Sequence, residues 1–275
     1  MLDFIKVVIL GIVEGITEWL PVSSTGHLIL VGDLLAPSMS DAFMEMFNVV
    51  IQLGAIMAVV VIYFDKLNPF SNKKNQRQKL LTWQMWIKVA IASVPAAIIG
   101  LLFNDIIDKL FYKPFPVAVM LVVYGVLFII VENRNADRRP TVKKIADLDV
   151  KMLLWIGVFQ MLALIPGTSR SGATIVGALL IGVSREVAAE FTFFLAIPVM
   201  FGASFLKILK FGLGFTFAEF GLLLVGCIVS FVVSIFAIKF LMSYIKKNDF
   251  KIFGYYRIVL GALIVLVSLV RMIFA

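Results

Sequence analysis

Apolar segments of about 20 residues recur along the chain, and they limit its fold more than any other feature. Segments 47–64 and 252–273 are two examples, each long enough to cross a bilayer as a helix. Hydrophobic residues make up 61% of the 275 residues and charged residues 15%, whereas soluble domains have about 45–50% and about 25%. The chain cannot cover itself with polar surface. This excludes soluble globular, disordered, collagen-like and coiled-coil proteins and predicts an all-α polytopic membrane protein.

Basic residues are concentrated in short stretches between the apolar segments. The 25 Lys and Arg residues outnumber the 17 Asp and Glu residues, which gives a net charge of +8. The excess lies mainly in segments 66–79, 134–144 and 246–251. This is the positive-inside distribution of membrane proteins. We therefore place these loops in the cytoplasm and expect membrane lipids, and no nucleic acid, as partners.

Cysteine and histidine usage excludes two kinds of site. The single cysteine, Cys227, cannot form an intramolecular disulfide, and a single histidine cannot complete a zinc-ligand pattern. The N-terminus lacks a basic leader and a small-residue cleavage site, so we expect it to be retained.

Proline, glycine and small polar residues divide the chain into ten expected helical segments. These are 2–20, 26–36, 42–64, 84–103, 115–132, 151–165, 172–182, 186–209, 217–243 and 253–273. Six are long enough to span, but 26–36 and 172–182 are not. Roughly a dozen residues at about 1.5 Å each cover little more than half of a ~30 Å hydrocarbon layer. We interpret each short segment, with the helix before it, as a re-entrant hairpin. If each hairpin were instead two helices that both span the membrane, every loop would lie on the same side of the membrane as before. The interpretation as hairpins therefore rests on segment length.

The two halves of the chain resemble each other. Residues 11–14 recur as 157–160, and the turn at 21–26 recurs as 166–172, with an offset of about 144–146 residues. Interrupted apolar segments at matching positions in two halves indicate a binding site near the bilayer midplane.

We therefore predict a single integral membrane domain over 1–275, built as an inverted-topology repeat of six spanning helices and two re-entrant helical hairpins. The first repeat covers about 1–133 and the second about 150–275, with a basic cytoplasmic loop between them. Three spans in each half are an odd number of crossings, so the second copy is inverted. The first hairpin then enters from outside, the second enters from inside, and their tips can meet in the bilayer core.

Two acids lie on the first apolar helix. Glu14 and Glu18 are four residues apart, which places both carboxylates on one helical face about one turn apart. Such a pair is costly in a membrane unless water, a cation or a basic partner compensates it. The structural interpretation is that the pair lies near an interface or that one acid is protonated. The functional interpretation is that the two glutamates act in acid–base catalysis or coordinate a divalent cation, because hard oxygen ligands suit magnesium or calcium.

A polar turn follows this helix and carries Ser23, Ser24, Thr25, Gly26 and His27. The hydroxyls can cap the next helix and leave its free N–H groups aimed at the turn. His27 can likewise be a structural histidine. Beside two glutamates and three hydroxyls, however, it is a candidate general acid–base or nucleophile.

The second turn supplies a cation. Arg170 lies between two serines at the start of a half-helix, and flanking glycines allow the backbone to approach a ligand. Free N–H groups, a positive helix end and a guanidinium together suit a phosphate. The alternative is that Arg170 pairs with Glu14 or Glu18, and the two roles are compatible. The residues that we expect to bind substrate are Ser23, Thr25, Gly26, Gly167, Thr168, Ser169, Ser171 and Gly172.

These two turns resemble the signature regions of the undecaprenyl-diphosphatase family, also called the bacitracin-resistance protein family. The runs are E-G-I-T-E-W-L-P-V-S-S-T-G-H at 14–27 and P-G-T-S-R-S-G at 166–172. The similarity includes Q-L-G-A at 52–55 and A-E-F-T-F at 189–193 and covers essentially the whole chain. On matching positions, the family's motif acids would be Glu14 and Glu18, its hydroxyl–imidazole cluster Ser23, Ser24, Thr25 and His27, and its phosphate-binding pair Ser169 and Arg170.

The resemblance implies a bacterial membrane phosphatase. Such an enzyme hydrolyses undecaprenyl diphosphate to undecaprenyl phosphate and inorganic phosphate, which recycles the lipid carrier for cell-wall synthesis. The resemblance also implies an inverted-repeat fold with re-entrant hairpins, a divalent-cation requirement and raised bacitracin tolerance.

The catalytic residues that we expect are Glu14, Glu18, Ser24, His27 and Arg170, with a cation on the two glutamates. Arg170 and the two half-helix N-termini would hold the phosphoryl oxygens, because phosphoryl transfer needs mainly positioning and charge stabilisation. Ser24, activated by His27 or a glutamate, is the first candidate nucleophile. A water on the cation and His27 itself are the next candidates.

A lipid-phosphate or anion transporter is the alternative function, because inverted repeats with broken helices also build secondary transporters. A transporter has no use for a nucleophile beside paired acids, and this favours the enzyme. We expect a bacterial inner-membrane location, with the prenyl tail in a groove open to lipid and the active site opening to the outer face. We also allow for a homodimer.

Overall fold

The computed structural model describes residues 2–212 and 214–274. Its helices are α1 (Leu2–Thr17), α2 (Ser24–Leu35), α3 (Asp41–Ile62), α4 (Phe64–Leu67), α5 (Gln76–Phe111), α6 (Pro114–Asn135), η1 (Ile145–Asp147), α7 (Val150–Leu162), α8 (Arg170–Leu180), α9 (Arg185–Phe211), α10 (Phe217–Ile245) and α11 (Lys251–Phe274). All ten expected segments form helices. The described residues contain no strand, only an isolated bridge between Val142 and Val183. The predicted all-α class is confirmed.

Six described helices are long and apolar enough to cross a membrane: α3, α5, α6, α9, α10 and α11. This confirms the predicted multi-pass membrane protein. The largest difference from the sequence-based limits is at α5, which begins at Gln76 and ends at Phe111. The expected segment, 84–103, covered only its most apolar part. Residues 76–83 contain good helix formers and no glycine or proline, so the helix continues into its polar flank.

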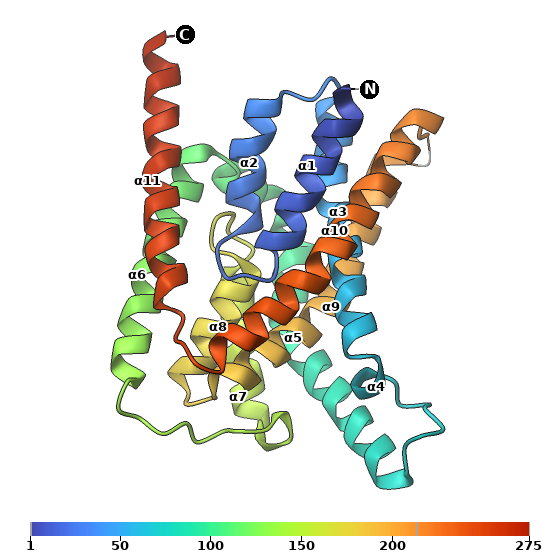
Figure 1. The fold of residues 1–275 in the computed structure, drawn as a ribbon, viewed down its shortest axis with the longest axis vertical. Coiled ribbons are helices and arrows are strands. Elements are labelled where there is room, and N and C mark those ends of the chain that lie inside the picture. The colour runs from blue at the N-terminus through green and yellow to red at the C-terminus, as the bar shows by residue number, and fades with distance from the viewer. Residues whose placement is uncertain (1, 213, 275) are drawn as a thin grey trace.

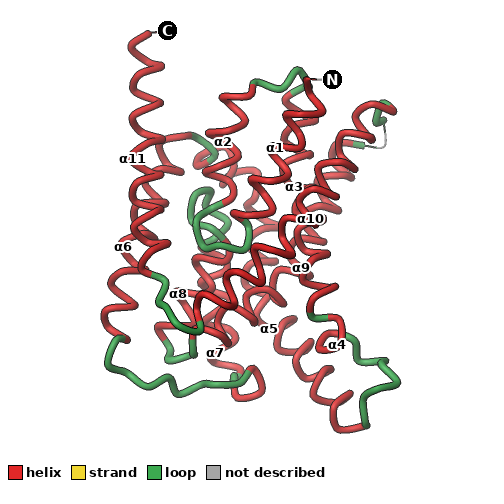
Figure 2. The backbone as a smooth tube through the Cα atoms, viewed as in Figure 1, coloured by secondary structure: helices red, strands yellow, loops and turns green. Residues whose placement is uncertain are grey.

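The four shorter apolar helices form two hairpins that approach each other from opposite ends of the molecule (Figure 1). The pair α1 and α2 runs from the end that carries the N-terminus, and the pair α7 and α8 runs from the other end. Their connecting loops lie together in the middle of the molecule (Figure 2). The basic loops 68–75, 136–149 and 246–250 all lie toward the end from which α7 and α8 enter (Figure 1).

The first helix of each hairpin packs against a long helix from the other half of the chain. α1 packs against α10, whereas α7, which corresponds to α1, packs against α5. Corresponding glycines make these contacts. A Cβ atom on Gly11 would lie 2.9 Å from the carbonyl oxygen of Gly226, and one on Gly157 would lie 2.6 Å from that of Ala92. Small residues allow this close approach of membrane helices. This packing across the halves is what an inverted repeat would produce, and the repeat itself stays a prediction.

The helices α2 and α8 begin in the same unusual way. Each is preceded by a serine with a positive φ angle, 72° at Ser23 and 69° at Ser169. Ser23 Oγ accepts a hydrogen bond from the backbone N–H of Gly26 at 3.4 Å, and Ser169 Oγ accepts one from that of Gly172 at 3.2 Å. A serine in this region costs about 1–3 kcal/mol, and such strain is concentrated at functional sites. Both tips therefore hold a constrained helix N-terminus.

Candidate active site

Glu18 is the point at which the two hairpin tips meet. Its Oε2 atom accepts a hydrogen bond from Ser24 Oγ at 2.7 Å, and its Oε1 atom accepts one from Arg170 Nη2 at 3.1 Å. Its backbone carbonyl accepts a third, from Ser171 Oγ at 3.2 Å. The carboxylate is almost fully buried. A hydroxyl, a carboxylate and a guanidinium are thus held together in the interior, and the ion pair weighed between Arg170 and a glutamate is present.

Arg170 is held on two further sides. Its Nη1 atom donates to the carbonyl oxygen of Thr192 in α9 at 2.8 Å, and its guanidinium carbon lies 5.8 Å from the centre of the Trp19 ring. Trp19 in turn packs edge to face against Phe193, with ring centres 5.2 Å apart. The Nε atom is buried and has no hydrogen-bond partner among the described residues. The orientation of the guanidinium is therefore fixed, and one donor is left for a ligand.

Glu14 is the most exceptional side chain of the site. It is fully buried, and neither carboxylate oxygen has a hydrogen-bond partner among the described residues. Glu18 and Arg170 act on it electrostatically. Gln160, which occupies the same place in the second half, is also buried, with both polar atoms unpaired in the described part of the chain. Buried polar atoms without partners are rare in folded proteins, and each calls for an explanation such as an ion or water.

A divalent cation fits these donors. Two carboxylates on consecutive helical turns supply hard oxygen ligands, and the orphaned oxygens of Glu14 are available for coordination. The described residues contain no group of three or more His, Cys, Asp or Glu side chains that could hold a metal. A cation on Glu14 and Glu18 would therefore complete its shell with hydroxyl, carbonyl, water or phosphate oxygens, which is the usual arrangement for magnesium.

Among the described residues, His27 is hydrogen-bonded to neither carboxylate. Its Nδ1 atom donates to the carbonyl oxygen of Ser23 at 2.7 Å, and its Nε2 atom lies 2.7 Å from the hydroxyl of Tyr256 in α11. Because a carbonyl oxygen only accepts, Nδ1 carries a proton, and Nε2 shares a second hydrogen bond with the Tyr256 hydroxyl. Ser24 is hydrogen-bonded to Glu18 instead of to His27. Of the two activating groups that we considered for Ser24, the described contacts favour the glutamate.

The remaining residues that we expected to bind substrate all lie in the two turns. Ser169 Oγ lies 3.2 Å from Ser171 Oγ, and the buried Thr168 hydroxyl has no partner in the described chain. Thr25 and Gly26 occupy the first turn of α2. Gly167 has a φ angle of 91°, and a Cβ atom there would lie 2.4 Å from the carbonyl oxygen of Val117. This contact gives Gly167 a packing role, in addition to the binding role that stays a prediction.

Arg257 of α11 donates hydrogen bonds to backbone carbonyls of both hairpin tips. It is fully buried and donates from Nη1 to the Pro21 carbonyl at 3.2 Å. Its Nη2 atom donates to the carbonyls of Gly167 at 2.9 Å and Thr168 at 2.7 Å. The guanidinium carbon lies 5.7 Å from the centre of the Tyr124 ring. Its partners among the described residues are backbone carbonyls and the Tyr124 ring, so no described carboxylate neutralises its charge, which adds to the positive field at the tips.

Comparison with known proteins places this chain in a family. The model of the family described as bacitracin resistance protein BacA matches residues 7–263. The chain belongs to this family. A BacA-family relative named undecaprenyl-diphosphatase, from Acetivibrio thermocellus, is 63% identical over 266 residues, which are 97% of this chain and 98% of the relative. Relatives of the same name from Enterococcus faecalis and Desulfitobacterium hafniense are 60% identical over 273 residues and 58% identical over 267 residues. Each alignment covers at least 96% of both chains.

Sequence reasoning missed two residues of α11 that contact the hairpin tips or His27. Arg257 lies in the second turn of α11, close to the basic loop at 246–251, where a single arginine is ordinarily an interfacial anchor. Tyr256 beside it gave no signal at all. The available clue was that a charged residue six positions into a spanning helix needs a partner within the bundle.

Proposed function

We propose that the protein hydrolyses undecaprenyl diphosphate to undecaprenyl phosphate and inorganic phosphate. The names of its close, full-length relatives support this activity. The product would be the lipid carrier that cell-wall synthesis consumes, so the protein would recycle that carrier.

One observation carries the proposal: Glu18 accepts hydrogen bonds from both Ser24 and Arg170. A hydroxyl bonded to a carboxylate is an activated nucleophile, and a fixed guanidinium is a binding group for phosphoryl oxygens. α2 and α8 begin at the two hairpin tips, and their N-termini add backbone N–H groups that suit an anion. Positioning and charge stabilisation are the main requirements of phosphoryl transfer, and this site supplies both.

The reaction that fits this geometry has two steps. Ser24 Oγ attacks the terminal phosphorus and its proton passes to Glu18, while the bond from that phosphorus to the bridging oxygen breaks. Undecaprenyl phosphate leaves with the bridging oxygen and receives the proton from Glu18. Water then attacks the phosphoserine and gives its proton to Glu18, and the bond from phosphorus to Ser24 Oγ breaks. Glu18 returns that proton to Ser24, and inorganic phosphate is released.

A divalent cation, magnesium or calcium, would be held by Glu14 and Glu18, where it would neutralise charge on the diphosphate. The unpaired oxygens of Glu14 are the observation in favour of it. Arg170 and Arg257 supply positive charge at the two hairpin tips. His27 and its partner Tyr256 would set the position of the Ser23 turn and stay a second candidate for proton transfer.

We further propose the bacterial inner membrane as the location, with the site opening to the outer face. The hairpin of α1 and α2 enters from the end opposite the basic loops, and basic loops favour the cytoplasm (Figure 1). In this placement both hairpins are re-entrant and the halves form an inverted repeat. A homodimer stays a prediction.

Phosphate release in detergent tests the function. Purified full-length protein should release inorganic phosphate from undecaprenyl diphosphate with no membrane separating two compartments, whereas a transporter would release none. The relatives' names give the transporter alternative no support. Ser24→Ala should reduce release on the order of 100-fold or more, because the nucleophile is lost. Ser93→Ala is a matched control, since among the described residues the Ser93 hydroxyl donates to the Val89 carbonyl of its own helix and to no site residue. Normal release by Ser24→Ala would reject Ser24 as the nucleophile.

A further inference from the structure

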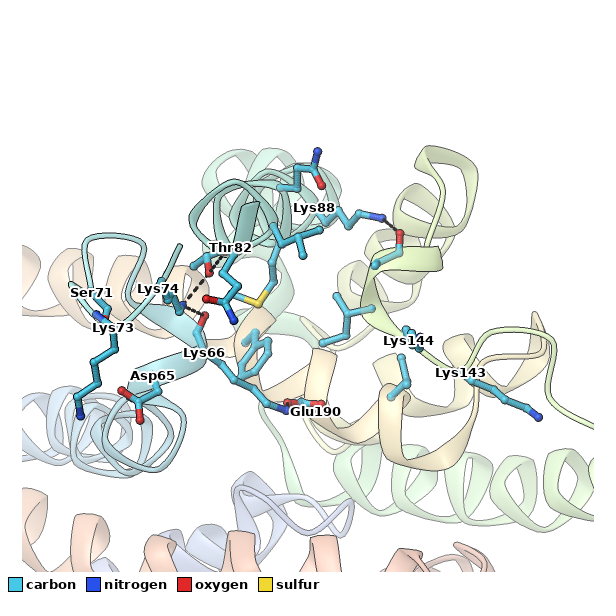
Figure 3. Close-up of a pocket in the computed structure, with 18 residues that line it drawn as sticks. Asp65, Lys66, Ser71, Lys73, Lys74, Thr82, Lys88, Lys143, Lys144 and Glu190 are labelled. Carbon is cyan, nitrogen blue, oxygen red and sulfur yellow. Dashed lines mark hydrogen bonds and ion pairs between the residues drawn. The ribbon is translucent and has the colours of Figure 1, made fainter. Parts of the chain in front are cut away.

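A second cleft lies at the end of the molecule that carries the basic loops, away from the hairpin tips. Its volume is about 650 Å³. One wall is the beginning of α5, the opposite wall is the beginning of α9, and the mouth is bordered by the loop after α4 and by residues 143–146 (Figure 3). Neither catalytic turn contributes a described residue to its lining.

Lysines dominate the charged residues of this cleft. The described lining contains Lys66, Lys73, Lys74, Lys88, Lys143 and Lys144 against the two acids Asp65 and Glu190. Three of the lysines are engaged within the protein. Lys66 pairs with Glu190 at 2.5 Å, Lys74 donates to Thr82 Oγ1 at 2.7 Å, and Lys88 donates to the Ala146 carbonyl at 2.7 Å (Figure 3).

The other three lysines are available to a ligand. The side chains of Lys73, Lys143 and Lys144 are exposed and form no ion pair or hydrogen bond with any residue that the structure describes. Lys73 belongs to the loop after α4, whereas Lys143 and Lys144 come from the opposite side of the cleft (Figure 3). These three ammonium groups border the cleft from two opposite sides and are unpaired among the described residues, so together they give its mouth a positive field that attracts an anion.

Below this basic mouth the wall is apolar. Leu81 and Met85 of α5 face Val187 and Phe194 of α9 across the cleft. Leu81 is also one of the exposed apolar residues of α5, together with Leu80 and Trp83, so the apolar wall continues onto the outer surface of that helix. A free phosphate ion would gain nothing from such a wall, whereas a hydrocarbon chain would.

Exposed aromatic residues place the cleft at the depth of lipid headgroups. Phe70 and Trp83 are both exposed, and their rings pack edge to face with centres 5.7 Å apart. Trp83 follows Thr82, which lines the cleft. Aromatic residues of this kind gather where the hydrocarbon layer meets the headgroup layer. A lysine-rimmed mouth at this depth, on the basic side, fits the anionic lipids of the cytoplasmic leaflet.

We propose that this cleft binds an anionic phospholipid. The phosphodiester headgroup lies at the mouth of the cleft, in the positive field of Lys73 on one side and of Lys143 and Lys144 on the other, and an acyl chain lies against Leu81 and Met85. The ligand is held there without chemical change, so the site is separate from the proposed phosphatase activity and its occupancy is measurable without that activity.

Native mass spectrometry of the full-length protein in detergent tests the proposal. Dioleoyl phosphatidylglycerol is titrated in, with dioleoyl phosphatidylcholine as the zwitterionic comparison. The test variant is Lys73→Gln/Lys143→Gln/Lys144→Gln. The matched control is Arg139→Gln/Lys246→Gln/Lys247→Gln, which removes the same number of exposed positive charges at the same end of the molecule, outside the cleft.

The wild type and the control variant should retain one phosphatidylglycerol more tightly than phosphatidylcholine. The test variant should bind it on the order of 100-fold more weakly at low salt, at about 1 kcal/mol for each lysine. Wild-type binding should also weaken as salt is raised, which requires no variant. Equal losses in the two variants, or equal binding of the two lipids, would overturn the proposal. Displacement of the lipid by millimolar inorganic phosphate would show a free-anion site and would overturn it as well.

Discussion

Arg170 Nη2 lies 3.1 Å from Glu18 Oε1, although the two residues are 152 positions apart in the chain. Glu18 belongs to the tip of the first hairpin and Arg170 to the tip of the second, and the hairpins come from opposite ends of the molecule (Figure 1). Neither half of the chain therefore contains the site alone. Any activity of the site depends on how the two tips are held against each other.

Replacing Arg170 should abolish activity while leaving the fold intact. Arg170→Lys retains a positive charge but cannot reach both Glu18 and the Thr192 carbonyl with a planar fork. We expect phosphate release to fall by about 10²–10³-fold for Lys and at least as much for Ala, which is the range for loss of one fixed donor to a developing oxyanion. Release from undecaprenyl diphosphate in detergent measures the effect. Arg139→Ala, an exposed arginine in a basic loop, is the control. Near-normal release by Arg170→Ala would eliminate the anion-site assignment.

Glu14→Gln should uncouple thermal stability from divalent cations. Without a cation, the wild type must keep a buried carboxylate without a partner beside Glu18. The amide removes the negative charge and its repulsion with Glu18, so we expect the unfolding temperature in EDTA to rise by a few degrees. Added magnesium or calcium should then raise the unfolding temperature of the wild type and not of the variant.

Glu186→Gln, at an exposed acid in the first turn of α9, is the control for this cation effect and should respond as the wild type does. An equal response to cation in wild type and Glu14→Gln would place the cation elsewhere.

Arg257→Met should lower stability and activity together. The variant leaves the carbonyls of Pro21, Gly167 and Thr168 without their donor in a fully buried place. We expect a loss on the order of 3 kcal/mol or more in the free energy of unfolding, at about 1–3 kcal/mol for each unsatisfied group. Tyr124→Phe, which retains the ring against the guanidinium, should cost much less. Unfolding in mixed micelles and phosphate release measure the two quantities. A stable variant with normal release would show that Arg257 does not hold the tips.

Much of the fold follows from local features of the sequence. The length of an apolar run determines whether a helix can span, and proline followed by small polar residues marks each hairpin turn. For this reason all ten expected segments appear as helices, and Glu18, Ser24 and Arg170 could be selected as site residues before their contacts were known. The limits of α5 were wrong at both ends because hydrophobicity reports where a helix lies in the membrane, not where its hydrogen bonding ends.

The features of the site that could not be predicted from the sequence depend on tertiary contacts. The role of Arg257 depends on carbonyls from two turns that are far from it in the chain. The direction of the His27 ring depends on Tyr256 in the last helix. Capping by Ser23 was expected from its residue type, but its positive φ angle was not, because serine seldom adopts it without a surrounding structure that enforces it.

The contact between α3 and α10 gives the sharpest test of the packing. A Cβ atom on Gly54 would lie 2.0 Å from the carbonyl oxygen of Cys227, so Gly54→Ala must push the two helices apart. Gly202 in α9 has no atom within 4 Å of the corresponding position, so Gly202→Ala is the matched control. Alanine should stabilise the helix at Gly202 by up to about 1 kcal/mol, because glycine is the poorer helix former. At Gly54 the same change should cost about 1–3 kcal/mol, the usual penalty for overpacking. Unfolding free energies of the two variants measure the contrast. Equal effects in the two variants would contradict the close approach of α3 and α10.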